Sequence, residues 1–503
     1  MVAAAREKTV RLSYTAAEDT GRRGAFPDIF LPDKKQGLIV VETVKSIVLA
    51  GLSGGSGKSV VAVGLVAALA GRGRGVTVFK KGPDYIDAGW LSKAAGQPCY
   101  NLDPYLMPAE TVGTAFQRRI HGSSFAVIEG NRGIFDGVNA DGGFSTAELA
   151  QQLDLPVLLV LNCTKMTRTI AALILGCQAF DPRIRFAGVI LNQIATARHE
   201  TVIRQSFEKY TDLPVLGIMP RLKKDVFPMR HLGVTPHQEA TAADETVAGL
   251  AILAENHFDI DAIIGRMREV APLVSAQCGR VAPDVTIGVL RDAAFQFYYE
   301  ENLDALVAAG ARLVMVDALH FLELPPDLDG LYIGGGFPET SARQLADNAG
   351  FRRSVRERIE AGLPVYAECG GLIYLGRSIL LDGREYPLAD VFPVTFAIGS
   401  KPQAHGYSTF TVEKANSFYP LGARIKGHEF RYSIVHQWEG KSDDLVLAMD
   451  RGTGFADGRD GLVKHNAFAL YTHVMASGAP EWAEGFTAAA RRFAAHGRAA
   501  GPV

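Results

Sequence analysis

Residues 46–70 place an apolar stretch, a glycine-rich loop and a helix-forming stretch in direct succession. Residues 46–50 predict a buried strand, and residues 60–70 predict a helix that ends at the Gly71-Arg72-Gly73 stop signal. Between them lies Gly51-Leu52-Ser53-Gly54-Gly55-Ser56-Gly57-Lys58-Ser59. This order is typical of a phosphate-binding loop, because backbone N–H groups and the positive end of the helix can surround an anion.

The residues of this loop have separate expected roles. Lys58 would contact the terminal phosphates of ATP, and the hydroxyl of Ser59 would bind Mg²⁺. The backbone around the phosphates would come from Gly54, Gly55, Ser56 and Gly57. Five residues, rather than the usual four, separate Gly51 from Gly57. A longer loop of this kind also occurs in a subgroup of nucleotide-dependent synthetases, so ATP remains the expected ligand.

Composition limits the broad class of the protein. The chain has 503 residues, 48% of them apolar, which is enough for two or three domains. Its net charge of −2 argues against a general nucleic-acid binder, and no apolar run reaches the length of a membrane span. The five cysteines are widely spaced without a Cys-x-x-Cys pair, which favours a reducing cytoplasm over a disulfide framework. Residues 1–44 show no signal peptide and are expected to be an N-terminal extension.

The first half, residues 45–270, alternates apolar and helical stretches. This alternation predicts an α/β domain with a parallel sheet that is covered on both faces. A long helical segment is expected over residues 246–270, followed by a linker at 271–284. The expected strands are 75–80, 124–129, 155–161, 186–192 and 213–218, with helices at 146–153 and 167–180.

A second α/β domain is expected over residues 285–497. Its strands are predicted at 285–290, 312–316, 330–333 and 363–367, with antiparallel strands from about residue 382 and a final helix at 480–495.

The second half contains a candidate nucleophile at the end of a predicted strand. Cys369 is followed by Gly370, Gly371 and a helical stretch, an arrangement that exposes a reactive side chain. Downstream, His473 could act as a base. A second glycine loop follows the strand at 330–333, and oxyanion donors are expected from Gly335, Gly336 and Gly370.

These features resemble a known family. The second half resembles a class I glutamine amidotransferase domain, and the chain from about residue 45 resembles the cobyrinic acid a,c-diamide synthase family. The motifs that carry the resemblance are residues 79–87 (Phe-Lys-Lys-Gly-Pro-Asp-Tyr-Ile-Asp), 101–104, 129–130 with 135–137, 230–233, the cysteine turn and 427–433.

The resemblance implies a P-loop NTPase-like, dethiobiotin-synthetase-like domain followed by a class I glutamine amidotransferase domain. It also implies an enzyme that hydrolyses glutamine, channels ammonia and uses ATP to amidate the a and c acetate side chains of a tetrapyrrole through an acyl phosphate. The expected partners are L-glutamine and a tetrapyrrole polycarboxylate, without nucleic acid or membrane, and a homodimer is left open.

The resemblance also assigns roles to individual residues. Cys369 would be the glutaminase nucleophile and His473 its base, but the third member of the site stays open because Met475 stands where many such domains have a carboxylate. The remaining assignments are Asp84 and Asp136 near the γ-phosphate and the substrate carboxylate, Glu129 with Ser59 on Mg²⁺, Asn192 on the adenine base, and Lys81 and Tyr85 on the tetrapyrrole. Lys80, Arg132 and Arg230 are weaker candidates for the tetrapyrrole rim.

Three departures from the family pattern bear on the substrate. They are Asn131-Arg132 after the acidic strand end, residues 162–165 (Asn-Cys-Thr-Lys) after the next strand, and Arg431 in place of a second histidine. Two of them add positive charge near the expected substrate edge. We therefore hypothesise a sirohaem-type ring as substrate, with cobyrinic or hydrogenobyrinic acid as the alternative.

A different class of function also stays open. The first half could be a nucleotide-switched ATPase of the partitioning or metal-insertion type, with a non-catalytic second domain. Cys369, His473 and the two glycine loops argue against that alternative, because a passive binding domain has no need of them together.

Overall fold

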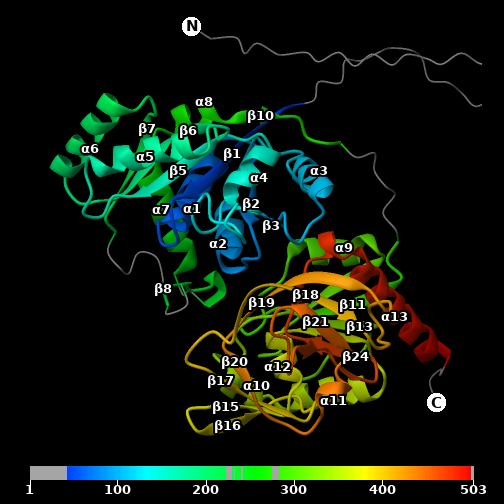
Figure 1. Ribbon diagram of the computed structural model, residues 1–503. Helices are drawn as coiled ribbons and strands as arrows, with labels where there is room; N and C mark the ends of the chain where they lie inside the picture. The colour runs from blue at the N-terminus through cyan, green and yellow to red at the C-terminus, as the bar shows by residue number, and fades with distance from the viewer. Residues whose placement is uncertain (1–41, 223–228, 231–232, 240–241, 275–281, 500–503) are drawn as a thin grey trace, which may run out of the picture.

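The computed structural model describes residues 42–222, 229–230, 233–239, 242–274 and 282–499. The expected N-terminal extension therefore lies almost entirely outside the described residues, as does the middle of the expected linker. Figure 1 shows two α/β units, an N-terminal one in blue to green and a C-terminal one in green to red. No helix of the described segments is both long and apolar enough to cross a membrane.

The N-terminal unit is built on an eight-stranded sheet of order β3-β2-β4-β1-β5-β6-β7, with β10 paired to β1. The neighbours along this order are all parallel, which confirms the predicted parallel sheet. The strands are β1 (Val44–Gly51), β2 (Val76–Lys81), β3 (Cys99–Leu102), β4 (Phe125–Glu129), β5 (Val157–Asn162), β6 (Phe186–Ile194), β7 (Val215–Pro220) and β10 (Arg268–Val270). A separate hairpin pairs β8 (Met229–Arg230) with β9 (Gly233–Val234).

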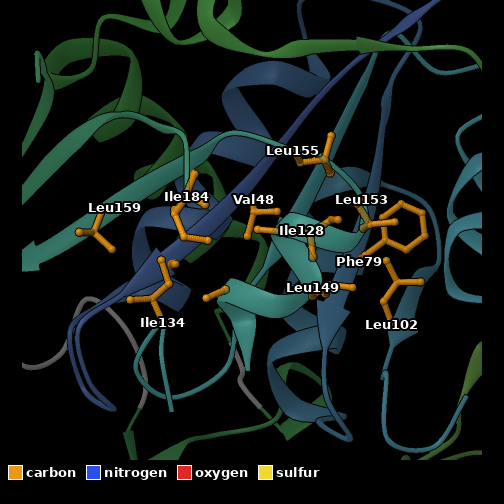
Figure 2. Close-up of a cluster of buried hydrophobic side chains, with 14 of the residues drawn as sticks. Val48, Phe79, Leu102, Ile128, Ile134, Leu149, Leu153, Leu155, Leu159 and Ile184 are labelled. Atoms are coloured by element: carbon orange, nitrogen blue, oxygen red, sulfur yellow. The ribbon is translucent and has the colours of Figure 1, made fainter. Parts of the chain in front are cut away.

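Helices cover both faces of this sheet because alternate residues of each strand point to opposite sides. Ile47 and Leu49 of β1 pack with one set of helices, and Val48 and Ala50 pack with the other. The first set is α1 (Lys58–Ala70), α2 (Ile86–Ala95), α7 (Ala243–His257) and α8 (Ile260–Arg266). The second set is α3 (Ala109–Arg119), α4 (Thr146–Gln152), α5 (Thr169–Phe180) and α6 (Ala197–Tyr210). Figure 2 shows part of the second cluster, with Val48 and Ile128 beside Leu149.

The expected helix over residues 246–270 is wrong in its length. The structure forms α7 and α8 instead, and the chain then extends into β10, which pairs antiparallel with β1. The break has a local cause, because the Asp259 side chain accepts a hydrogen bond from Ala262 N at 3.0 Å and so caps a new helix.

The C-terminal unit has a six-stranded sheet of order β12-β11-β13-β14-β24-β23. Its strands are β11 (Val285–Leu290), β12 (Ala311–Val316), β13 (Gly330–Ile333), β14 (Val365–Glu368), β23 (Leu462–Lys464) and β24 (Ala467–Leu470). Its helices are α9 (Glu300–Ala308), α10 (Ala342–Asp347), α11 (Ala349–Glu360), α12 (Gly370–Leu375) and α13 (Pro480–Ala499). The strand β14 lies inside this sheet, between β13 and β24, and it leads directly into α12.

The predicted antiparallel region forms two smaller mixed sheets. One has the order β16-β15-β17-β20 and contains β15 (Ser378–Leu381), β16 (Arg384–Pro387), β17 (Val394–Ile398) and β20 (Ser433–Trp438). The other has the order β22-β21-β18-β19-β25 and contains β18 (Ala404–Val412), β19 (Arg424–Arg431), β21 (Leu447–Arg451), β22 (Arg459–Asp460) and β25 (His473–Val474). The second sheet matters for the site because β19 and β25 place His428 opposite His473.

Side chains from both units meet in a polar and aromatic interface. Glu301 at the start of α9 accepts a hydrogen bond from Asn101 N of β3 at 2.7 Å. The Tyr407 hydroxyl of β18 donates to Asp103 Oδ2 at 2.9 Å, and its ring stacks on Tyr105 with centroids 4.1 Å apart. Because these contacts lie beside β2 and β3, they bring the carboxyl edge of the first sheet against the second unit.

Candidate active site

The loop between β1 and α1 depends on glycine backbone conformations. Gly57 has φ +88°, and a Cβ atom there would lie 1.9 Å from the Asn192 side-chain nitrogen. That nitrogen donates to Ser56 O at 2.9 Å. Asn192 was predicted as an adenine contact, but in the structure its amide braces the loop. Gly54 and Gly55 have open space around their Cβ positions, which leaves their backbone accessible to a phosphate.

The Lys58 side chain folds back over this loop. Its Nζ donates to Ser53 O at 3.0 Å and to Arg132 O at 2.7 Å. Burial, together with the neighbouring Lys80 ammonium, lowers the pKa of Lys58. The predicted phosphate-contacting amine therefore lies within the curve of the loop and next to the segment that follows β4.

Ser59 and Glu129, the predicted Mg²⁺ ligands, lie side by side. The Ser59 hydroxyl donates to Glu129 Oε1 at 2.9 Å, and Glu129 is completely buried at the end of β4. Its other oxygen, Oε2, has no hydrogen-bond partner in the described part of the chain. Burial raises the pKa of Glu129 to about 7. A hydroxyl and an unpartnered carboxylate oxygen fit Mg²⁺, which takes few protein ligands and completes its shell with phosphate and water oxygens.

Lys80 has a role that the sequence did not reveal. Its Nζ lies 2.6 Å from Asp87 Oδ2, 3.3 Å from Glu129 Oε1 and 3.9 Å from Asp84 Oδ2. Although burial alone would lower the pKa of Lys80, these carboxylates raise it well above its ordinary value. The side chain is only 1% exposed, so Lys80 is the internal counter-charge of the carboxylates and is not a contact on the tetrapyrrole rim.

The two predicted catalytic aspartates differ in environment. Asp84 Oδ1 accepts a hydrogen bond from Asp87 N at 3.0 Å, and burial with the nearby Asp87 charge raises the pKa of Asp84 to about 6. Asp136 lies in the exposed loop after β4, where its Oδ2 accepts a hydrogen bond from Gly133 N at 2.9 Å. Asp84 thus belongs to the Lys80 cluster, while Asp136 faces solvent.

The basic residues expected near the substrate do not all lie in one place. Lys81 is buried, and burial lowers its pKa although Asp103 opposes this effect. Arg132 and Lys165 are exposed, and the side chain of Arg230 lies outside the described residues. Arg431 donates to Ser433 O at 2.6 Å and to Gly454 O at 2.8 Å, with its guanidinium over the Tyr471 ring. The structure therefore contradicts the expectation that Arg431 adds charge at the substrate edge.

In the second unit, Cys369 sits on a sharp turn between β14 and α12. Its φ of +46° and ψ of −94° are strained for a residue with a Cβ, and its side chain is slightly exposed. The predicted oxyanion loops meet at this turn. A Cβ on Gly335 would lie 2.4 Å from His473 Cε1, and a Cβ on Gly370 would lie 2.9 Å from Gly336 N. Only glycines allow these segments to approach so closely.

His473 has a carboxylate partner that the sequence left unidentified. Its Nδ1 lies 3.4 Å from Oε2 of Glu368, the residue directly before Cys369. Tyr332 OH donates to the same oxygen at 3.2 Å, and Val474 N donates to Glu368 Oε1 at 3.2 Å. Burial opposes the charged imidazole, but contacts with Cys369 and Glu368 raise the pKa of His473 to about 10. Glu368, rather than Met475, is the candidate third member of the site.

Rings from both units surround His473. The His428 ring stacks on it at 4.9 Å between centroids, and Tyr299 OH lies 3.1 Å from His428 Nδ1. Burial, with His473 nearby, lowers the pKa of His428 well below its ordinary value, so this second imidazole is neutral. Tyr85, predicted as a substrate contact, comes from the N-terminal unit and lies 5.4 Å from the His473 ring.

Known families cover both units. Residues 47–232 match the CobQ/CobB/MinD/ParA nucleotide binding domain, and residues 286–480 match the CobB/CobQ-like glutamine amidotransferase domain. These matches confirm the predicted order of a nucleotide-binding domain followed by an amidotransferase domain.

Curated relatives match over most of their length. The cobyrinate a,c-diamide synthase of Magnetococcus marinus is 40% identical over 437 residues, which cover 85% of this chain and 93% of that protein. The synthase of Archaeoglobus fulgidus is 38% identical, covering 86% and 94%, and that of Dehalococcoides mccartyi strain 195 is 36% identical, covering 89% and 98%. The chain therefore belongs to the cobyrinate a,c-diamide synthase family of glutamine amidotransferase-type ligases.

Proposed function

We propose that this protein releases ammonia from L-glutamine in its C-terminal unit and uses ATP in its N-terminal unit to amidate the a and c acetate side chains of cobyrinic acid. The catalytic units would be residues 45–270 and 285–497, joined by a linker at 271–284. The observation that carries the proposal is the convergence of Cys369, His473 and Glu368 at one sheet edge. The charged cluster around Lys80 and the phosphate loop lies in the adjoining unit.

The proposed glutaminase reaction uses the Cys369 sulfur as nucleophile. His473 takes the thiol proton, the sulfur attacks the side-chain amide carbon of glutamine, and the imidazole returns the proton to the departing nitrogen as ammonia. Water then hydrolyses the thioester to glutamate and restores the thiol. The contact of Glu368 with His473 Nδ1 would hold the ring in orientation and stabilise its charged form.

The proposed synthetase reaction makes a carboxylate reactive toward ammonia. A substrate carboxylate oxygen attacks the γ-phosphorus of ATP, ADP leaves, and an acyl phosphate forms. Ammonia then attacks the acyl carbon, phosphate leaves, and one proton is released with the amide. Lys58 and the loop amides would hold the phosphates, with Asp84 and Asp136 near the reacting groups. Ser59 and Glu129 would hold Mg²⁺, which supplies neutralisation of phosphate charge when bound.

The proposed substrate is cobyrinic acid because the curated relatives carry that substrate in their names. Lys81 and Tyr85 remain the proposed contacts to the macrocycle. The sirohaem hypothesis depended on added charge at the substrate edge, and Arg431 uses its guanidinium inside the C-terminal unit. That observation weakens the case for a sirohaem-type ring.

Mass spectrometry of purified rings tests the proposal. Incubation with ATP, Mg²⁺ and glutamine should convert two carboxylates of cobyrinic acid to amides, and omission of either ATP or glutamine should prevent the change. Glutamate release by the wild type and by Cys369→Ser tests the glutaminase half separately. Amidation of a sirohaem-type ring in preference to cobyrinic acid would refute the substrate assignment, and no glutamate from the wild type would leave the nucleotide-switched ATPase as the better description.

A further inference from the structure

Tyr85 is a residue of the N-terminal unit whose ring is embedded in the C-terminal unit. The ring stacks nearly parallel on Phe297, with centroids 5.2 Å apart and planes 8° apart. It also contacts Tyr299 at 4.8 Å, the His473 ring at 5.4 Å and the His428 ring at 5.7 Å. One aromatic side chain from the synthetase unit thus packs directly against the candidate glutaminase base.

The backbone of Tyr85 belongs to the other centre. Its sequence neighbour is Asp84, which faces Lys80 in the charged cluster. The side-chain amide of Asn101 donates to Gly82 O at 2.8 Å and to Asp84 O at 3.1 Å, which fixes the turn before Tyr85. The backbone on one side of the residue is therefore anchored near the proposed acyl phosphate, and its ring is anchored near His473.

The rings around Tyr85 form a continuous wall. Phe297 extends it by an edge-to-face contact with Phe337, which follows the glycine loop at residues 334–336. On its other side, Tyr85 lines an interdomain cavity of about 360 Å³ together with Ser92, Asn101 and Tyr298. Tyr85 therefore borders the glutaminase histidine and also the space between the units.

The hydroxyl of Tyr85 does not explain this position. It is buried, and no group in the described residues forms a hydrogen bond with it. Because a buried hydroxyl gains nothing from lacking a partner, the contacts that hold the side chain here are those of the ring. A phenylalanine should fill the same position, whereas an alanine would open the wall.

We propose that Tyr85 is a gating residue that couples glutamine hydrolysis to amide synthesis. In the position seen here its ring separates His473 from the interdomain cavity, and movement of the turn at Asp84 would move the ring. Ammonia would then leave the glutaminase site when the synthetase site is occupied. This inference rests on the proposed function, because it assumes both half-reactions.

The test compares Tyr85→Ala and Tyr85→Phe with the wild type, using glutamine, ATP, Mg²⁺ and cobyrinic acid. We expect about one glutamate per amide in the wild type and in Tyr85→Phe, and about three or more in Tyr85→Ala, because an open wall lets ammonia escape to solvent. The ratio of glutamine-supported to ammonium-supported synthesis should fall by a similar factor in Tyr85→Ala. Both readouts are ratios, so they do not depend on the overall activity of a variant.

Tyr105→Ala is a matched control. It also removes an interdomain aromatic stack, the one with Tyr407, but its ring is not among those that contact His473. Tyr105→Ala should keep the wild-type ratio.

Two results would overturn the gating role. One is a Tyr85→Ala enzyme in which glutamate and amide fall together with an unchanged ratio. The other is equal uncoupling by Tyr105→Ala, which would assign the effect to domain docking in general. Failure of the proposed function is recognised separately, because the wild type would then release no glutamate or form no amide.

Discussion

The two candidate centres use different means to hold reactive groups in a buried place. The N-terminal centre balances opposite charges, with the Lys80 ammonium among Asp84, Asp87 and Glu129. The C-terminal centre has one close pair of ionisable groups, His473 and Glu368, enclosed by aromatic rings and a neutral His428. Charge balance suits the binding of a polyanion with its cation. Enclosure by rings suits a covalent intermediate that must be shielded from premature hydrolysis.

This difference gives each centre its own assay. Variants of the C-terminal centre should remove only glutamine-supported synthesis, because ammonium salts bypass it. Variants of the N-terminal centre should remove synthesis with either nitrogen source. The predictions below test that separation.

The largest effect is expected from Cys369→Ala. Without the sulfur no thioester can form, so glutamine-supported synthesis should fall by about a thousandfold or more. Synthesis with ammonium chloride should remain measurable, because the ATP site is untouched. Product formation is followed by mass spectrometry with each nitrogen source, and Cys177→Ala on α5 is the control cysteine. Equal loss with both nitrogen sources would show that the centres are not separable.

Lys58→Met should act on the other centre. Loss of the phosphate-contacting ammonium should lower synthesis by about a hundredfold or more with glutamine and with ammonium alike. The exposed Lys209 on α6 provides a charge-matched control as Lys209→Met. Glutamate release measured without ATP should persist in Lys58→Met. Selective loss of the glutamine-supported rate would contradict the assignment of Lys58.

Glu368→Gln should reduce glutaminase turnover by about a hundredfold, because the charge that stabilises and orients His473 is removed. The pKa of His473 should also fall, since Glu368 is one of the groups that raise it to about 10. The pH profile of glutamate release and NMR titration of His473 measure the two effects. Tyr332→Phe removes only one hydrogen bond to Glu368 and should cost much less. An unchanged His473 pKa in Glu368→Gln would exclude Glu368 as its partner.

A smaller effect is expected from pH on the N-terminal centre. Burial raises the pKa of Asp84 to about 6 and that of Glu129 to about 7, so both carboxyl groups become charged as pH rises from 5.5 to 7.5. Synthesis at a fixed concentration of free ammonia should rise several-fold over this interval. The same shift predicts that the nucleotide-free protein loses stability as pH rises there, because its folded state holds protons that the unfolded state has released. A rate and a stability that are both flat across this interval would contradict the shifts.

Features set by local sequence were predictable. The strand, glycine loop and helix around Lys58 lie within one continuous segment, as does the turn at Cys369 between β14 and α12. Short or polar elements such as β3 and α6 were missed, since they lack a sustained apolar pattern. The extended segment of β10 was also missed, because its pairing with β1 joins residues more than 200 positions apart.

The partners of the site residues depended on distant contacts and on one unusual turn. Lys80 was considered for the substrate rim because nothing near it in sequence shows that Glu129 lies 3.3 Å from its ammonium. Glu368 was not considered as the partner of His473, because neighbouring residues of a strand normally point to opposite faces. The positive φ of Cys369 ends the strand at that point and removes this restriction.

The backbone at Cys369 also has a consequence for stability. A side chain with a Cβ costs about 1 kcal/mol or more in this region of φ and ψ, whereas glycine adopts it readily. Cys369→Gly should therefore fold more tightly than Cys369→Ala, although neither can turn over glutamine. Selection for turnover keeps a poorly suited residue at this turn, so thermostability screens without an activity assay would favour its loss.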